Sequence, residues 1–386
     1  MQKLSFRKFF HKIKKKKIMK HFEDIKKNAS QFVIYGDLVN IELFGKTKEN
    51  NIYLLTYNQA GTTVRYIIKR LNNKLYEQPI QAVSNAVKAA KYILTALKTN
   101  NCTEPSREVL TFLYSQIGKP YICDDNGNYW MTCLYIENTT IYEKFETPEL
   151  AKEAAKTYAH FHGLLADIPS KSFQTTIKDH YNIEALFNIY EEALKNDFQN
   201  RKNTISEVVT FLNNNKAIPN TVCNLLQNGE IQPHAILNNV KPSRLLFDST
   251  TKKGIAIFDL DSAMCGNYLF HLGEVVRNFM LSTNIFQKEN NDTSKFLLFF
   301  EAIVKGYFEA GKSFLSTKEI DNLVNGAEFV VFFKLLLFVT NYLNNNISSQ
   351  NFSEEKAIES CNEQLHFLKI LQSNSLQLNE IVKNAE

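Results

Sequence analysis

The amino-acid sequence changes character near Glu137, and this change constrains the fold more than any other feature. Before it, short runs rich in β-branched and aromatic residues alternate with turn-like clusters of Gly, Asn and Lys, a pattern that predicts an antiparallel sheet. The runs expected to form strands are residues 32–36, 52–57, 64–71, 109–115, 120–123 and 129–136. One helix is expected among them, because Ala82, Ala86, Ala89 and Ile93 fall on a single helical face.

After Glu137 nearly every segment has helical periodicity. The predicted helices are residues 148–165, 183–199, 206–214, 267–280, 295–310, 317–343 and 354–373, with one β-hairpin across residues 245–248 and 254–258. A chain of 386 residues with 44% apolar residues can bury the cores of two lobes. We therefore expect an α+β fold with a β-rich lobe at residues 29–137 and a helical lobe at residues 138–386, preceded by a basic, disordered tail at residues 1–28.

The net charge of +5 is concentrated at the N-terminus. Eight of the 45 Lys and Arg residues lie within residues 1–18, which contain no acid, so the rest of the chain carries 37 basic against 40 acidic side chains. Because nucleic-acid binding requires a concentrated positive face, the body of the chain is not expected to bind nucleic acid. Residues 1–18 are predicted to be a solvated tail or an extension ahead of a start at Met19. The alternative is weak contact with an anionic surface through a short cationic helix.

The cysteines and the apolar runs indicate where the protein resides. The six cysteines are scattered, without a CxxC pair or a histidine at zinc-binding spacing, which favours a reducing, cytoplasmic compartment. No apolar run reaches the ~18 uncharged residues that a transmembrane segment requires. The most apolar stretch, residues 329–339, is interrupted by Lys334, and we expect it to be a buried helix.

The most specific pattern lies in the predicted helical lobe. Residues 237–248 read Leu-Asn-Asn-Val-Lys-Pro-Ser-Arg-Leu-Leu-Phe-Asp, and residues 257–261 read Ile-Phe-Asp-Leu-Asp. Together they resemble the catalytic loop and metal-binding segment of the aminoglycoside phosphotransferase-like kinases, in particular the N-acetylhexosamine 1-kinase branch. Weaker resemblances occur in the family's order at residues 66–72, 128–130, 135–137, 306–308 and 338–343. The resemblance implies a two-lobed protein kinase-like fold, with ATP and Mg²⁺ as cofactors and an alcohol group as acceptor.

Several residues depart from the family's catalytic loop. Asn239 stands where the family has the catalytic Asp, and an amide cannot accept the proton of the attacking hydroxyl, a loss that typically costs ~10²–10⁴ in rate. Leu237 replaces the loop His. Arg244 replaces the metal-binding Asn, and a permanently cationic guanidinium cannot bind Mg²⁺. The metal-binding Asp is retained as Asp259, and Asp261 follows it.

These replacements lead to a specific hypothesis about Arg244. We expect it to take the place of the metal ion and to neutralise Asp259, and Asp261 as well, through a charge-assisted pair. The alternative is that Arg244 points outward into solvent.

The resemblance assigns further residues to ligand binding. The residues that match nucleotide-binding positions are Lys69, Lys241, Tyr135 and Ile136. His180 matches a histidine near the sugar, and is therefore the expected substrate contact.

Other positions argue against retained activity. Residues 45–51 contain one glycine where the family has a glycine-bearing turn, and Ser84 replaces the acid expected to pair with the N-lobe lysine. Tyr181 replaces an acid next to the substrate histidine. His160 and His162 are expected to pack in the core rather than to bind a ligand.

Three functions are compatible with these residues. The first is a catalytically impaired pseudokinase that acts by binding a small molecule or a protein. The second is an active ATP-dependent kinase that phosphorylates a sugar such as an N-acetylhexosamine at its anomeric hydroxyl, with Glu230 or Glu274 as the replacement base. The third is either a transferase that uses Asp259 and Asp261 differently or a peripheral membrane protein attached through its basic tail.

Overall fold

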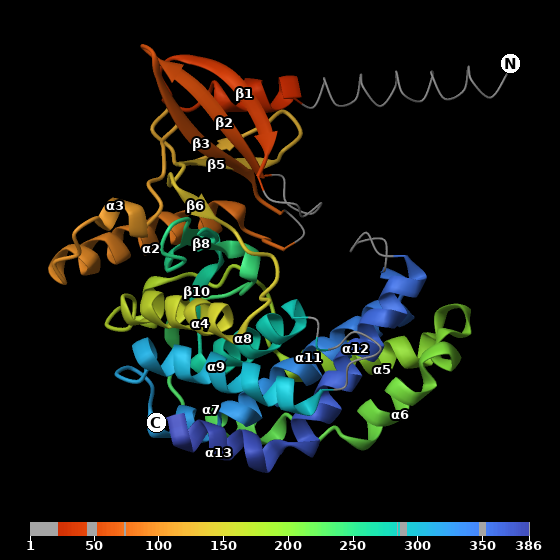
Figure 1. Ribbon diagram of the computed structural model, residues 1–386. Helices are drawn as coiled ribbons and strands as arrows, with labels where there is room; N and C mark the ends of the chain where they lie inside the picture. The colour runs from red at the N-terminus through yellow and green to blue at the C-terminus, as the bar shows by residue number, and fades with distance from the viewer. Residues whose placement is uncertain are drawn as a thin grey trace, which may run out of the picture. The chain divides into compact units, whose positions relative to one another are not determined.

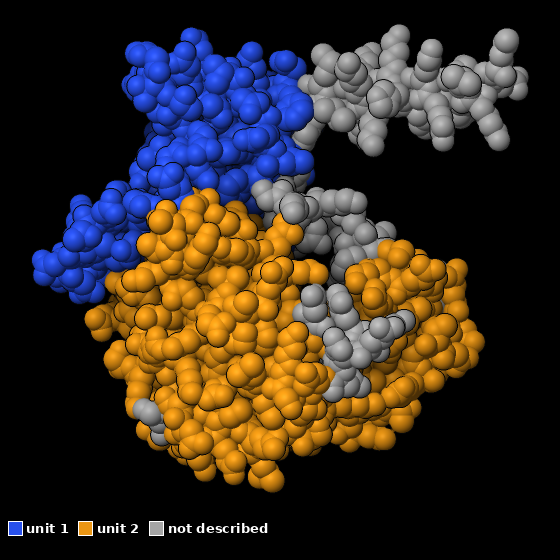
Figure 2. Space-filling view, in the orientation of Figure 1, with its two compact units in different colours: residues 1–138 blue, residues 139–386 orange. Residues whose placement is uncertain are grey.

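The chain divides into two compact units in a computed structural model, which describes residues 22–44, 52–72, 75–283, 285, 292–346 and 353–385 (Figure 1). The first unit comprises residues 1–138 and the second residues 139–386 (Figure 2). The division falls one residue after the boundary expected from the sequence. Two sequence features, the basic residues 1–18 and the single-glycine turn at residues 45–51, lie outside the described residues.

The first unit is built on an antiparallel sheet in the order β1-β2-β3-β5-β4. Its strands are β1 (Asp37–Leu43), β2 (Ile52–Gln59), β3 (Thr62–Arg70), β4 (Ile122–Cys123) and β5 (Tyr129–Leu134). β2 and β3 form a hairpin around Ala60 and Gly61, which both have positive φ, as a tight two-residue turn requires. The predicted strands at residues 52–57, 64–71, 120–123 and 129–136 are therefore confirmed.

The predicted strands at residues 32–36 and 109–115 are wrong. Both segments form isolated single-residue bridges instead of strands. The first run ends at Gly36, whose φ of +87° turns the chain. A Cβ at this position would lie 2.2 Å from the carbonyl oxygen of Asn58, so the close approach of the two backbones requires glycine.

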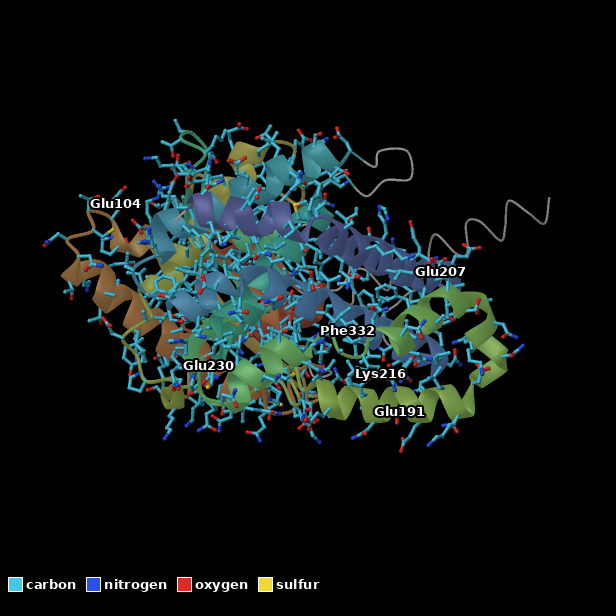
Figure 3. The ribbon with its side chains drawn as sticks, turned by 90° about the horizontal axis from the view of Figure 1, so that it is seen from below. Glu104, Glu191, Glu207, Lys216, Glu230 and Phe332 are labelled. Atoms are coloured by element: carbon cyan, nitrogen blue, oxygen red, sulfur yellow. The ribbon has the colours of Figure 1, made fainter. Side chains whose placement is uncertain are left out.

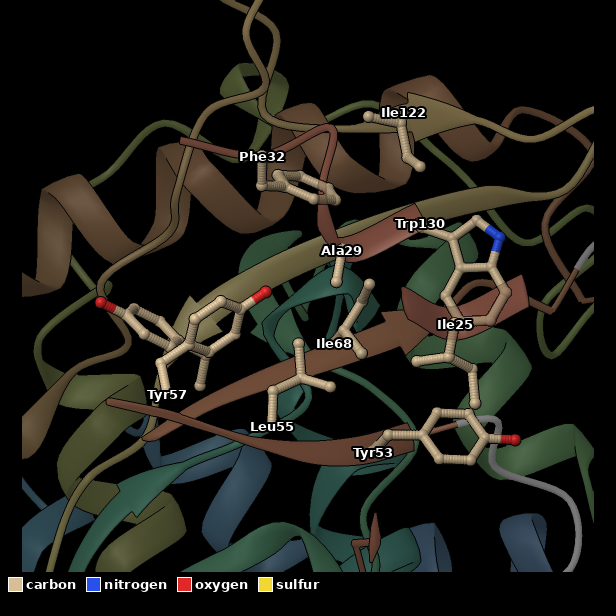
Figure 4. Packing of buried hydrophobic residues seen from close by; sticks show 10 residues of the cluster. Ile25, Ala29, Phe32, Tyr53, Leu55, Tyr57, Ile68, Ile122 and Trp130 are labelled. Atoms are coloured by element: carbon tan, nitrogen blue, oxygen red, sulfur yellow. The ribbon is translucent and has the colours of Figure 1, made fainter. Parts of the chain in front are cut away.

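A helix at residues 22–29 packs on this sheet. Its Ile25 and Ala29 are fully buried in a cluster that includes Leu55, Ile68 and Trp130 (Figure 4). The prediction of a disordered tail is therefore wrong for residues 22–28, because their apolar side chains form part of the core of the first unit.

The helix predicted within the first unit is confirmed as α2 (Pro79–Thr99), which a short helix, α3 (Pro105–Glu108), follows. The small side chains of Ala82, Ala86 and Ala89 are fully buried on one face of α2. The predicted period therefore identifies the packed face of this helix.

The second unit is mostly helical. Its α-helices are α4 (Pro148–Gly163), α5 (Ile183–Asn196), α6 (Ser206–Asn214), α7 (Asn220–Gln227), α8 (Tyr268–Ser282), α9 (Thr293–Gly311), α10 (Thr317–Asp321), α11 (Leu323–Leu343), α12 (Glu354–Ser373) and α13 (Ser375–Ala385). All predicted helices are present, but the one at residues 317–343 divides into α10 and α11 at Asn322. α7 and α13 are additional, and α7 is too short, at 8 residues, to show a clear period.

On the surface, Lys216 pairs with Glu191 of α5 at 2.9 Å (Figure 3).

α11 is the core helix of the second unit. By length and composition it could cross a membrane, but 72% of its most apolar window is buried, and it packs against α5, α8 and α12. The buried helix predicted at residues 329–339 is confirmed. Gly273 of α8 allows a very close approach to α11, because a Cβ there would lie 2.6 Å from the carbonyl oxygen of Gly326.

Two small sheets hold the segment that resembles a catalytic loop. β7 (His234–Leu237) pairs with β10 (Ala263–Gly266), while β8 (Leu245–Asp248) pairs with β9 (Gly254–Ile257) and with β6 (Thr139–Thr140). The predicted hairpin is confirmed as β8 and β9. Residues 238–244, here called the loop, connect β7 to β8 and end in the 3-10 turn η3 (Pro242–Arg244). A second turn, η4 (Leu260–Ser262), leads into β10.

Candidate functional site

The loop lies against the segment that follows β9. The backbone N–H of Asn238 donates to the carbonyl of Ser262 at 3.2 Å, and the N–H of Phe258 donates to the carbonyl of Arg244 at 2.8 Å. These hydrogen bonds lie on either side of Asp259 along the chain. The two motifs that are separate in the sequence therefore form one site in space.

Asp259 is at the centre of this site and is 2% exposed. Its Oδ2 accepts a hydrogen bond of 2.6 Å from Nδ2 of Asn239. Nε of Arg244 lies 3.4 Å from the same oxygen, and Arg244 is 4% exposed. The predicted pair of Arg244 with Asp259 is confirmed, and the alternative of a solvent-exposed Arg244 is wrong.

The contact between Arg244 and Asp259 is an ion pair without a directed hydrogen bond from Nε. The Nε atom is buried and has no hydrogen-bond partner, although the carboxylate lies within ion-pair distance. Such a pair gives less geometric specificity than the bidentate arrangement that arginine and carboxylate groups often adopt. The arginine therefore supplies charge to Asp259 more than it supplies alignment.

Asn239 has a left-handed backbone conformation, with φ of +59°. Among residues that carry a side chain, Asn and Asp tolerate this conformation best. An Asn at this position, where the kinases that the sequence resembles have Asp, thus suits the backbone geometry of the loop. It also provides an N–H group that donates to Asp259, which an ionised carboxylate could not do.

These groups do not fit a Mg²⁺ site. Mg²⁺ requires oxygen ligands at about 2.0–2.1 Å in octahedral geometry. Oδ2 of Asp259 instead faces an amide N–H group and a guanidinium. Asp261, on η4, is also buried, with 1% exposure. Among the residues that the structure describes, no group of three or more His, Cys, Asp or Glu side chains could hold a metal ion.

Tyr158 of α4 holds the loop through the backbone of Lys241. Its hydroxyl accepts from the N–H of Lys241 at 3.3 Å and lies 3.4 Å from the carbonyl of the same residue. Burial raises the pKa of Tyr158, so the hydroxyl stays protonated. The side chain of Lys241 is half-buried, and its assignment to nucleotide binding stays a prediction.

His162 of α4 supports the end of β7. Its Nε2 accepts from the N–H of Leu237 at 3.1 Å, and its Nδ1 lies 3.0 Å from the hydroxyl of Tyr307. Burial lowers the pKa of His162 to about 3, so the ring is neutral and carries its proton on Nδ1. The sequence predicted packing for His162, and the residue is indeed fully buried. Its contact with Leu237 joins positions 75 residues apart, which no local pattern reveals.

His180 contacts the loop directly. Its Nε2 lies 2.9 Å from Oδ1 of Asn238. Burial, assisted by the positive charge of Lys334, lowers the pKa of His180 to about 4, so the neutral ring donates from Nε2. The flanking residues Asp179 and Tyr181 both have positive φ, 49° and 58°, which makes this turn strained. The assignment of His180 to a substrate stays a prediction.

A second buried carboxylate, Glu274 of α8, lies beside the loop. It pairs with Lys334 of α11 at 2.9 Å and accepts hydrogen bonds from the hydroxyl of Tyr181 and, at 2.5 Å, from Nδ2 of Asn278. Asn278 also donates to the carbonyl of Val240 at 2.7 Å, which connects these residues to the loop. We call Glu274, Lys334, Tyr181 and Asn278 the Glu274 cluster. Burial raises the pKa of Glu274, but neighbouring cations, Lys334 foremost, outweigh this effect and hold the pKa at about 2.

The sequence offered two carboxylates as replacements for the loop Asp, and both are engaged elsewhere. Glu274 is ionised and surrounded by its cluster. Glu230 (Figure 3) is exposed and pairs with Lys318 at 3.0 Å, and this contact lowers its pKa. A general base works best with a pKa near the operating pH, so a lowered pKa makes both residues poor bases.

The remaining predicted nucleotide-binding residues belong to the first unit. Lys69 is half-buried on β3, and Ile136 is buried after β5. The N–H of Tyr135 donates to the carbonyl of Arg65 at 3.0 Å, and the Tyr135 ring lies 5.8 Å from that of Phe44. The guanidinium of Arg65 lies 4.6 Å from the centre of the same ring. The backbone and ring of Tyr135 are thus part of the packing of the first unit, and nucleotide binding by these residues stays a prediction.

Comparison with known proteins bears on the fold. No family model matches the sequence. The chain is similar to the aminoglycoside phosphotransferase from Alicyclobacillus acidocaldarius subsp. acidocaldarius DSM 446, with a TM-score of 0.57 and 11% identity over 93% of this chain and 96% of that one. A microcompartment-associated aminopropanol kinase gives a TM-score of 0.60 and 14% identity over 91% of this chain and 98% of that one. A GDP complex of an aminoglycoside 2′-phosphotransferase-IIIa mutant gives a TM-score of 0.51 and 12% identity over 89% of this chain and 94% of that one.

These similarities establish the fold and confirm the fold that the sequence resemblance implied. The chain has the two-lobed α+β fold of the aminoglycoside phosphotransferase-like kinases. At 11% and 14% identity, the likeness reports on the backbone, and activity must be argued from the site.

Proposed function

We propose that this protein is a pseudokinase in which Arg244 and Asn239 take the place of the catalytic metal ion at Asp259. The observation that carries the proposal is the buried contact of both side chains with Oδ2 of Asp259. Phosphoryl transfer depends on a metal that bridges the phosphates and on a carboxylate that orients the attacking hydroxyl. Here the loop carboxylate is an amide, and the protein itself neutralises the metal-binding carboxylate. The protein therefore acts by binding a small molecule or a protein.

The proposal rests on the cost of burying charge. A buried carboxylate needs a counter-charge, because removing one partner of a buried pair costs about 3–5 kcal/mol. In an active kinase the metal supplies that charge, whereas Arg244 supplies it here permanently. For Mg²⁺ to bind Asp259, the guanidinium would have to leave its buried position or lie beside a divalent cation. Both changes are unfavourable.

Metal-independent nucleotide binding is a second candidate function. A GDP complex of a protein with this fold favours it. The residues that would contact the nucleotide are those that the sequence resemblance assigns to it, Lys69, Tyr135 and Lys241. Such binding requires neither the loop Asp nor the metal.

Thermal stability with and without ATP, measured in Mg²⁺ and in EDTA, tests the proposal. Nucleotide at 100-fold over its Kd stabilises a protein by about 2.7 kcal/mol, which is readily detected. We expect the wild-type chain to show the same shift in both buffers if it binds nucleotide without metal, and no shift in either if it does not bind nucleotide. The Asn239→Asp/Arg244→Asn variant restores the ligand types that Mg²⁺ prefers and should gain a shift that depends on Mg²⁺.

The matched control adds Asp259→Asn to the double variant, and this triple variant should lose the Mg²⁺ response again. A Mg²⁺-dependent shift in the wild-type chain that disappears on Asp259→Asn would contradict the proposal. That result would support the active kinase instead, and a phosphorylation assay with N-acetylhexosamines would then identify its product.

A further inference from the structure

The two units carry opposite net charge. Residues 1–138 contain 22 Lys and Arg against 11 Asp and Glu, whereas residues 139–386 contain 23 against 29. Eight of the basic side chains of the first unit lie within residues 1–18, where three phenylalanines are interspersed with them. A negatively charged surface therefore attracts the first unit and repels the second.

The first unit also exposes more apolar side chains. Of the large apolar side chains that are exposed in the described part of the chain, nine belong to the first unit and three to the second. The most exposed of the nine are Ile117, at 80%, and Tyr35, at 77%. Single scattered apolar side chains need no explanation, but their concentration on the smaller unit indicates an interaction surface.

Two of these side chains lie next to each other on neighbouring segments. Phe32 and Ser115 form an antiparallel bridge, and the N–H of Val33 donates to the carbonyl of Tyr114 at 2.9 Å. Phe32 and Ser115 are buried, so they point into the unit. Because side chains alternate between the two faces of paired segments, Val33 and Tyr114 lie side by side on the outer face.

Tyr35 and Ile117 follow this pair closely along the two segments. The carbonyl of Tyr35 accepts a hydrogen bond of 2.8 Å from Nε2 of Gln59, while the side chain is exposed. Ile117 lies in the turn at residues 115–119, which a backbone hydrogen bond of 2.7 Å closes. The backbone of both residues is thus held by hydrogen bonds. We call four residues the apolar patch: Val33, Tyr35, Tyr114 and Ile117.

The composition of the apolar patch suits the interface of a lipid bilayer. Residues 31–36 and 114–119 contain no acidic side chain and one cation, the exposed Lys119. Tyrosine favours the headgroup region, because its ring is apolar and its hydroxyl is polar. Valine and isoleucine gain free energy when they leave water. The apolar patch thus offers two rings for the headgroups and two aliphatic side chains for the boundary with the acyl chains.

Residues 1–18 join the first unit near the apolar patch. The helix at residues 22–29 packs in the core of this unit, and it is about 12 Å long at 1.5 Å per residue. At its end, the N–H of Phe32 donates to the carbonyl of Ala29 at 3.1 Å, so the helix leads directly into the apolar patch. A chain of 18 residues spans up to about 60 Å when extended. The basic side chains can therefore reach a surface that contacts the patch.

We propose that the first unit binds anionic lipid membranes, with residues 1–18 supplying the charge and the apolar patch entering the headgroup region. Each Lys or Arg near an anionic bilayer strengthens binding about fivefold. A nucleic acid offers the same negative charge but no apolar layer for Ile117, so the patch favours the membrane. The inference goes beyond the proposed pseudokinase function and does not depend on it. Its test contains neither nucleotide nor Mg²⁺, so the two proposals fail separately.

Sedimentation of the full chain with lipid vesicles tests the proposal. We expect the protein to pellet with vesicles of equimolar phosphatidylcholine and phosphatidylserine, and to stay in the supernatant with phosphatidylcholine alone. The Lys14→Gln/Lys15→Gln/Lys16→Gln/Lys17→Gln variant should bind about a hundredfold more weakly or worse, because four cations are lost. Salt at about 1 M should weaken binding of the wild-type chain in the same direction, because it screens the charges.

The apolar patch has its own variant and a matched control. Tyr35→Gln/Ile117→Gln removes two exposed apolar side chains and should weaken binding about tenfold or more. Leu298→Gln/Leu376→Gln changes two exposed apolar side chains of the second unit, and it should bind as the wild-type chain does. Both variants should melt near the wild-type temperature, because substitutions at exposed positions cost little stability.

The proposal is overturned if the wild-type chain stays in the supernatant with the anionic vesicles. Equal binding by the patch variant and its control would also overturn it, because residues 1–18 would then act alone. Single-stranded RNA, added at matched phosphate concentration, provides a third criterion. RNA should leave most of the wild-type chain on the vesicles, and its full release by RNA would show a general affinity for polyanions and overturn the proposal.

Discussion

Two buried carboxylates lie beside the same loop, and the protein neutralises them differently. Asp259 has an amide donor at 2.6 Å and a guanidinium at 3.4 Å whose Nε makes no hydrogen bond. Glu274 receives directed hydrogen bonds from Tyr181 and Asn278 and has the Lys334 ammonium at 2.9 Å. At Glu274 the donors are aligned with the carboxylate, whereas at Asp259 the cation supplies charge without a hydrogen bond from its Nε.

Lowering the pH should have the largest effect on stability, and it should act through His162 at a higher pH than through Glu274. His162 supports the loop, and burial lowers its pKa to about 3 from its ordinary value of 6.5. Its contribution to stability is therefore complete above pH 6.5 and is lost as the pH falls toward 3. The pKa of Glu274 is about 2, below its ordinary 4.5, so its contribution is lost only below pH 4.5.

Urea denaturation at several pH values checks this prediction. Below its ordinary pKa, His162 should make the free energy of unfolding fall by about 1.4 kcal/mol per pH unit. In a His162→Gln variant the slope between about pH 6 and pH 5 should be shallower by that amount. Equal slopes in the two proteins would show that His162 does not stay neutral in the folded state.

Arg244→Ala should have the next largest effect. It leaves Asp259 buried without its cation, and we expect a loss of about 3–5 kcal/mol in the free energy of unfolding. The Arg244→Ala/Asp259→Asn variant should recover most of this loss, because the unpaired charge is gone. Urea denaturation of the two single variants and the double variant gives the coupling energy. A coupling below about 1 kcal/mol would mean that the pair is no stronger than a surface pair.

Glu274→Gln should cost less than Arg244→Ala. Glutamine keeps the shape and can still accept hydrogen bonds, so the expected loss is about 1.5–3 kcal/mol for the charged hydrogen bonds. The matched control is Glu301→Gln, which removes an exposed carboxylate and should cost below about 0.5 kcal/mol. If the two losses are equal, the Glu274 cluster is not a network of charged hydrogen bonds.

Substitutions of Asn239 should have the smallest effect on the free energy of unfolding, and they separate the hydrogen bond to Asp259 from the backbone conformation. Asn239→Gly removes the hydrogen bond to Asp259 and keeps the left-handed backbone, with an expected loss of about 1.5 kcal/mol. Asn239→Ala removes the same bond and should lose a further ~1 kcal/mol, because φ is +59° at this position. Chemical denaturation of both variants separates the side chain from the backbone. An alanine variant as stable as the glycine variant would assign no strain to this conformation.

Local patterns predicted most of the fold, and they failed where long-range packing decided the outcome. Periodicity identified α2, which buries a single face, and the apolar run at residues 329–339 identified α11 as a buried helix. Residues 22–28 carry few apolar side chains, and their burial depends on the sheet that they pack against. One feature of the sequence indicates the Glu274 cluster. Lys334 interrupts an apolar helix, and a lysine in such a place needs a buried partner.

The sequence by itself determined the chemistry of the loop. An amide at Asn239 cannot take a proton, and a guanidinium at Arg244 cannot bind Mg²⁺, because these properties follow from residue identity alone. Only the tertiary structure decided that Arg244 turns inward to Asp259, that His162 supports Leu237, and that Lys334 meets Glu274. These contacts join residues from different elements, and their distances and burial arise from the packing of the whole second unit. The sequence specifies which chemical groups are present, and packing specifies which of them are buried and in contact.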